Sequence, residues 1–120
     1  MDERRKYVRI PEKSAISYNV IPTAMMGQFT TEDISQGGVR FMVHHFIPKD
    51  SHLKIKMTFG AASLTIEALV KLVWIKELPY SGSYEIGVQF IDIPQKAADH
   101  LLAYIKSFVT RKSGMGRYSV

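Results

Sequence analysis

The sequence predicts a mostly β protein, a six-stranded antiparallel β-barrel with one α-helix at its C-terminal end. Three observations lead to this fold class. Apolar and polar residues alternate along several short segments, which is typical of half-buried strands. Turn-forming residues separate these segments without helical segments between them, which argues against a parallel α/β sheet. Apolar residues at helical spacing occur in a single segment, near the C-terminus.

The N-terminal half contains three predicted strands. We expect the charged residues 1–13 to form a flexible, exposed arm. Strands are predicted over 15–20, 28–34 and 38–43, where apolar residues recur between turn signals. A tight turn over 35–37 separates the second strand from the third, so these two should form a hairpin. Glycine in that turn can adopt positive φ without a steric penalty.

The C-terminal half contains three more predicted strands and the helix. The segment 53–59 alternates with a period of two, as a half-buried strand does. The next segment, 64–75, is so long that its strand must bend or bulge. A further strand is predicted over 84–91. From 94 to 109, apolar residues recur three and four positions apart, and we expect this helical stripe to cover the open end of the barrel.

Length and composition limit the function classes. The 120 residues suffice for one domain, divided into the arm (1–13), a barrel with its helix (14–110) and a basic tail (111–120). No apolar run is long enough to cross a bilayer, and no signal-peptide core is visible, so we expect a cytoplasmic protein without membrane insertion. The chain has no cysteine. The net charge of +5 and the pI near 9.5 favour an anionic partner.

Two short polar clusters carry most of the functional signal. The first occupies residues 4–9 and reads RRKYVR, an RRxxxR pattern. Arginine donates forked hydrogen bonds to phosphate or to guanine O6 and N7, and its plane stacks on bases. The second occupies residues 33–38 and reads DISQGG, a DxSxxG pattern. Its carboxylate can accept hydrogen bonds from guanine N1–H and N2–H₂, its serine offers a hydroxyl, and glycine permits close approach of the backbone.

In this order, and ahead of a β-rich chain, the two clusters resemble the signature of the PilZ domain family, whose members are bacterial receptors for cyclic di-GMP. The sequence IGVQF at 86–90, with Val73 and Trp74 before it, also resembles the last strand pair of that family. The resemblance covers nearly the whole chain. It implies the family's fold, a barrel with a C-terminal helix, and it implies cyclic di-GMP as the ligand.

The resemblance also implies roles for individual residues. Arg5 and Arg9 match the two arginines that contact phosphate and guanine. Arg4 matches a preceding arginine that the family associates with two intercalated ligands in place of one. Trp74 either stacks on a guanine or is an aromatic residue of the core or barrel rim. The candidate ligand-binding residues are Arg4, Arg5, Arg9, Asp33, Ser35 and Gly38, with Gly37 and Trp74 as further candidates.

The sequence favours a binding module over an enzyme. It contains no nucleophile elbow and no phosphate-binding GxxxxGK[ST] loop. His44, His45, Asp50 and His52 lie close together, but their spacing matches no standard set of metal ligands, so we expect neither a metal nor a cofactor.

The leading hypothesis is a receptor or adaptor that orders its N-terminal arm when cyclic di-GMP binds and then signals to a protein partner, which the sequence does not identify. One alternative is a small basic β-barrel that binds single-stranded nucleic acid. It is disfavoured because the cations gather in the terminal segments and not on strand faces. The other alternative is a PilZ-like protein-interaction module that binds no nucleotide.

Overall fold

Residues 7–59 and 64–118 are described by the computed structural model, with side chains up to residue 110. Over these residues the chain forms strands separated by short loops and ends in one long helix. The elements are β1 (Ile10–Pro11), β2 (Ala15–Ile21), β3 (Met26–Ile34), β4 (Gly38–Val43), β5 (His52–Phe59), β6 (Leu64–Leu78), β7 (Ser83–Asp92) and α1 (Gln95–Tyr118).

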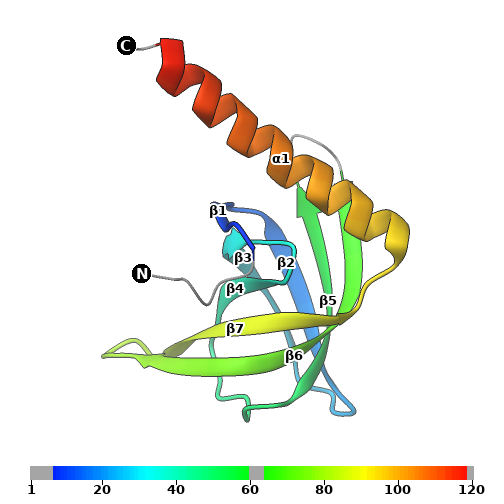
Figure 1. Ribbon diagram of the computed structural model, residues 1–120. Coiled ribbons are helices and arrows are strands. Elements are labelled where there is room, and N and C mark those ends of the chain that lie inside the picture. Colours follow the sequence, from blue (N-terminus) through cyan, green and yellow to red (C-terminus); the bar gives the residue numbers. More distant parts are fainter. Residues whose placement is uncertain (1–6, 60–63, 119–120) are drawn as a thin grey trace.

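The strands form one antiparallel sheet that closes on itself. Their order is β1-β3-β2-β5-β6-β7-β4, and an additional pairing of β3 with β4 completes the ring. Six strands, β2 to β7, therefore make a closed barrel, which confirms the predicted fold class (Figure 1). The short β1 lies outside the ring and pairs with β3.

The barrel interior is filled by the apolar residues of the alternating segments. In β5, Leu53, Ile55 and Met57 are buried while the lysines between them face solvent, as the period of two predicts. The long β6 bulges, as its length required: its pairing with β7 shifts between Leu72 and Trp74. β6 and β7 pair with each other out to Leu78 and Ser83, and the turn that joins them projects from the barrel (Figure 1).

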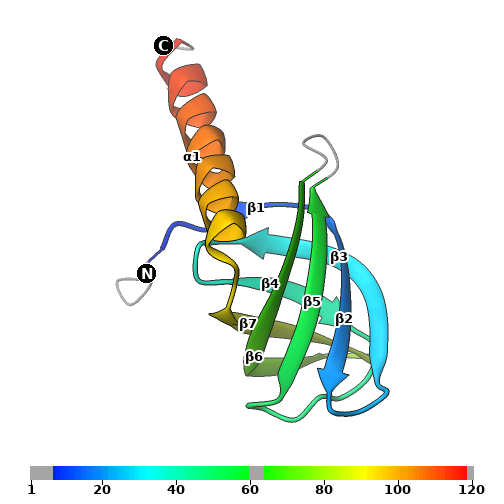
Figure 2. The ribbon, with the colours of Figure 1, turned by 90° about the vertical axis from the view of Figure 1, so that its right-hand side faces the viewer.

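The helix α1 covers one end of the barrel with its first half. Leu101 and Ile105 are buried against the core, while Tyr104 stacks on Phe59 with ring centroids 4.9 Å apart. The second half of α1 leaves the barrel and points away from it (Figure 2). The apolar stripe thus predicts the contact with the barrel, but the helix itself continues to Tyr118.

The boundaries of the expected domain division fall differently: the one after residue 13 lies between β1 and β2, and the one after residue 110 lies within α1. Ile10 is 1% exposed and pairs with β3, although it lies in the segment expected to be an arm. The division itself stays a prediction. No helix among the described residues is both long and apolar enough to cross a membrane.

Candidate functional site

The DxSxxG segment forms the tip of the β3–β4 hairpin, and Ser35 fastens it. The backbone N–H of Ser35 donates to the carbonyl of Gly38 over 2.9 Å. In return, Ser35 Oγ accepts hydrogen bonds from the N–H groups of Gly37 and Gly38 at 3.1 and 3.2 Å. Because its hydroxyl oxygen serves these two donors and the residue is 8% exposed, Ser35 stabilises the turn from within.

The two glycines are needed for space. A Cβ at Gly38 would lie 2.0 Å from the carbonyl oxygen of Val88 in β7, and one at Gly37 would lie 2.7 Å from the ring of Tyr7. Neither glycine has a φ in the left-handed region. The expectation that this turn uses glycine for positive φ is therefore wrong. Its glycines allow the hairpin tip to approach β7 and Tyr7 closely.

A cleft of about 380 Å³ opens beside this turn. It brings six of the sequence candidates together. These are Arg9, Asp33, Ser35, Gly37, Gly38 and Trp74. Arg4 and Arg5 lie outside the described residues, so their place relative to the cleft stays a prediction. The cleft is also lined by residues that the motifs do not include: Tyr7, Val39, Val73, Gly87, Val88 and Gln89.

Trp74 lies at the rim of the barrel and not in its core. The bulge in β6 inserts Val73, so Trp74 pairs with Gly87 and its side chain leaves the inward-facing row. The indole packs directly over Gly87, where a Cβ would lie 2.2 Å from its Nε1. Trp74 is half-buried and lines the cleft. Stacking on a guanine stays a prediction.

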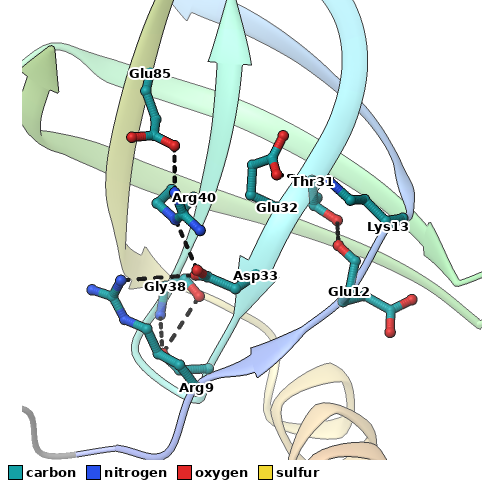
Figure 3. A network of polar contacts seen from close by, with 10 residues as sticks. Arg9, Glu12, Lys13, Thr31, Glu32, Asp33, Gly38, Arg40 and Glu85 are labelled. Atoms are coloured by element: carbon teal, nitrogen blue, oxygen red, sulfur yellow. Dashed lines mark hydrogen bonds and ion pairs between the residues drawn. The ribbon is translucent and has the colours of Figure 1, made fainter.

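Asp33 belongs to a chain of charges across neighbouring strands (Figure 3). Arg40 Nε donates to Asp33 Oδ2 over 2.7 Å, and Arg40 Nη1 donates to Glu85. On the other side, Arg9 Nη1 lies 3.8 Å from Asp33 Oδ1. Partial burial alone would lower the pKa of Arg40, but the bonds and charges of both carboxylates outweigh burial and raise this pKa above its usual value.

Arg40 and Glu85 lie outside both sequence motifs. A signal for Arg40 was present, because Asp33 and Arg40 flank the predicted hairpin tip, and opposite charges often pair across such strands. Both residues line a second cavity of about 530 Å³. The first and second cavities share Arg9, Asp33 and Trp74.

The base of the N-terminal segment is tied to the barrel and to α1. Tyr104 of α1 donates a hydrogen bond to Glu12 Oε1 over 2.7 Å. The backbone carbonyl of Glu12 accepts a hydrogen bond from Thr31 Oγ1, and Lys13 forms a 2.6 Å ion pair with Glu32 (Figure 3). These contacts hold the chain immediately after β1, three residues beyond Arg9.

The sequence model of one protein family, the PilZ domain, matches residues 3–107 of the chain. No match was found among curated protein sequences. Among solved structures, YcgR of Escherichia coli in complex with c-di-GMP is similar, with a TM-score of 0.77 and 16% identity over 98% of this chain and 51% of that chain. The Bacillus subtilis inhibitor of motility, MotI or DgrA, has a TM-score of 0.76 and 18% identity over 90% of this chain and 53% of that one.

The chain therefore spans about half the length of these two proteins. It spans the full length of a third similar structure, the isolated PilZ domain of E. coli YcgR with c-di-GMP, at a TM-score of 0.69, 16% identity and 98% of this chain. Identities this low indicate a shared fold.

Proposed function

The chain belongs to the PilZ domain family, and we propose that it is a cytoplasmic, non-enzymatic receptor for cyclic di-GMP. The observation that carries the proposal is the cleft in which Arg9, Asp33 and the Ser35–Gly38 turn meet beside Trp74. Cations for phosphate, a carboxylate for a base edge and an aromatic plane are the groups that a guanine dinucleotide requires.

Each group has a distinct task in this proposal. Arg9, together with Arg5, donates hydrogen bonds to phosphate or to the O6 and N7 edge of guanine. Asp33 accepts hydrogen bonds from guanine N1–H and N2–H₂, which adenine does not offer in that pattern. Gly37 and Gly38 line the cleft and let the hairpin tip pack against Tyr7 and β7, which holds the turn beside the ligand. Trp74 offers the face of its indole to a base, and Arg4 bears on whether one or two ligands enter.

The signalling part of the proposal concerns the N-terminal arm. Ligand binding orders the arm across the cleft, and the resulting surface is presented to, or withdrawn from, a protein partner. Its support is the arrangement around Arg9: the chain after it is fastened through Glu12, and the contact of Arg9 with Asp33 is long. Hydrogen exchange over residues 1–9, with and without ligand, measures this ordering, and equal exchange rates would exclude it.

Titration calorimetry with cyclic di-GMP tests the proposed function directly. We expect saturable binding of cyclic di-GMP, with a stoichiometry of one or two per chain, and at least about tenfold weaker binding of cyclic di-AMP and GTP. Absence of heat with cyclic di-GMP in a folded sample would overturn the proposal. Tight binding of single-stranded oligonucleotides that falls steeply with salt would instead support a nucleic-acid-binding barrel.

A further inference from the structure

Asp33, the carboxylate expected to select the base, lies where β3 is irregular. The register between β3 and β4 shifts between Thr31 and Asp33, which leaves Glu32 as an extra residue. A bulge of this kind re-aims the side chains that follow it. Asp33 then pairs with Arg40, on the face of β4 that does not point into the barrel.

The guanidinium of Arg40 is held from two sides. Its Nε donates to Asp33 Oδ2 over 2.7 Å, and its Nη1 donates to Glu85. The residue opposite Arg40 on β7 is Gly87, which contributes no side chain of its own and is covered by Trp74. The planar fork of arginine suits such a bridge between two carboxylates. Arg40 is therefore fixed while it engages one oxygen of Asp33.

Arg9 is the second cation beside this carboxylate. Its Nη1 lies 3.8 Å from Asp33 Oδ1, beyond the roughly 2.7–2.9 Å of a charge-assisted hydrogen bond. A carboxylate free to turn would be drawn into a forked pair with Arg9. In that pair, the two carboxylate oxygens and the guanidinium would be bonded to each other, so neither group would be available to the ligand. Because Arg40 holds Oδ2, it opposes this closure (Figure 3).

We propose that Arg40 is a positioning residue for base selectivity, which holds Asp33 open toward the cleft and keeps it from closing onto Arg9. Glu85 supports this role by anchoring the other end of the guanidinium. The proposal rests on the proposed function, since it assigns a determinant of selectivity within the same site. It predicts that Arg40 acts on the ligand through Asp33.

A double-mutant cycle tests this dependence. The readout is the preference for cyclic di-GMP over cyclic di-IMP, the analogue that lacks the 2-amino group, because this ratio reports the contact between the carboxylate and the base. We expect Arg40→Met to reduce the preference by about tenfold. In an Asp33→Asn background, the same substitution should change the preference by less than about twofold. Lys54→Met, which removes one charge from the exposed face of β5, is the matched control and should leave the ratio unchanged.

The outcomes separate this proposal from the proposed function. If the wild-type chain does not bind cyclic di-GMP, the proposed function fails and this inference fails with it. If the wild-type chain binds and Arg40→Met keeps the preference, the positioning role alone is overturned. Equal effects of Arg40→Met in both backgrounds would also overturn it, since Arg40 would then act independently of Asp33. Arg40→Lys, which keeps the charge without the fork, should give an intermediate ratio and replaces Arg40→Met if the latter does not fold.

A second experiment needs no ligand. A crystal structure of the Arg40→Met chain should show the Arg9 guanidinium moved to within about 3 Å of the Asp33 carboxylate. If the two groups stay as far apart as the present 3.8 Å, Arg40 does not hold them apart and the inference is wrong.

Discussion

The two sides of the cleft are built in opposite ways. On one side, the Ser35–Gly38 turn is closed by its own hydrogen bonds and docked on β7, where Phe90 N–H donates to the Gly37 carbonyl over 2.9 Å. On the other side, Val8 is 60% exposed, and Arg9 reaches the turn side through one 3.8 Å approach to Asp33. The turn side is part of the folded barrel, whereas the N-terminal side lies over it, with the Tyr7 ring against Gly37 and Arg9 beside Asp33.

Because the two sides are built differently, the turn side should determine stability and the N-terminal side should determine ligand affinity. Substitutions in the turn remove interactions that hold strands together, so they should reduce the free energy of unfolding and affect binding as a consequence. Substitutions of Arg5 and Arg9 remove groups proposed to bind the ligand, so they should reduce affinity with little effect on the free energy of unfolding. Four changes test the comparison.

Gly38→Ala should have the largest effect. Its Cβ would lie 2.0 Å from a backbone oxygen of β7, which cannot yield as a flexible side chain can. We expect a loss of about 3 kcal/mol in the free energy of unfolding, measured by urea denaturation. Gly82→Ala is the matched control: it has open space around it and positive φ, so about 1 kcal/mol of strain is expected. Equal losses at both positions would refute the steric explanation.

Ser35→Ala should have the next largest effect. It removes the acceptor for the N–H groups of Gly37 and Gly38, and the loss should be about 2 kcal/mol by the same denaturation measurement. Ser81→Ala removes comparable hydrogen bonds in an exposed turn and should cost less than about 0.5 kcal/mol. If Ser35→Ala lowers affinity for cyclic di-GMP without lowering stability, Ser35 serves the ligand and not the turn.

Arg9→Ala should show the opposite behaviour. We expect cyclic di-GMP affinity to fall at least about tenfold, or roughly 1.4 kcal/mol, by titration calorimetry, and we expect the same for Arg5→Ala. The free energy of unfolding should stay within about 0.5 kcal/mol, because the ion pair with Asp33 is long and partly exposed. Lys13→Ala removes a cation from the same segment as a control and should leave affinity within about twofold. Unchanged affinity in both arginine variants would remove them from the site.

Tyr104→Phe should have the smallest effect. It keeps the ring that stacks on Phe59 but removes the hydrogen bond to Glu12, which anchors the base of the N-terminal segment. A loss of about 1 kcal/mol in unfolding free energy is expected. Tyr80→Phe, at a fully exposed hairpin tip, should change nothing measurable. If Tyr104→Phe changes the free energy of unfolding as little as Tyr80→Phe does, this hydrogen bond does not anchor the segment.

The fold followed closely from the sequence because buried strands leave a strong period of two. The same rule fails where a strand gains a residue. Strict alternation along β6 would put Trp74 on the inward row with Leu72, but the bulge at Val73 turns it to the rim. The short β1 escaped prediction because two residues, Ile10 and Pro11, show no period.

The site was less predictable than the fold. The two motifs identified residues at its centre, because a turn and a cationic segment can each be recognised from residues that are neighbours in the sequence. Arg40 and Glu85 have no motif, because their contact joins positions far apart in the chain. The sequence suggested close approach of the backbone at Gly38, but it did not identify the group that Gly38 approaches, because the Val88 carbonyl is distant in the chain.

The short strand β1 also limits where residues can be inserted or deleted without disturbing the site. Ile10 is buried in the interior opposite Ile34, and Pro11 is paired with Asp33. Arg9 directly precedes this fixed pair of residues, so its position is determined by β1. One inserted residue between Arg9 and Ile10 would move the arginine by about 3.3 Å and turn its side chain to the opposite face. The barrel would tolerate that insertion, but the cleft would lose its cation. An insertion or deletion between Arg9 and Ile10 should therefore change ligand binding, and so should one in the β3–β4 turn, whose residues also line the cleft.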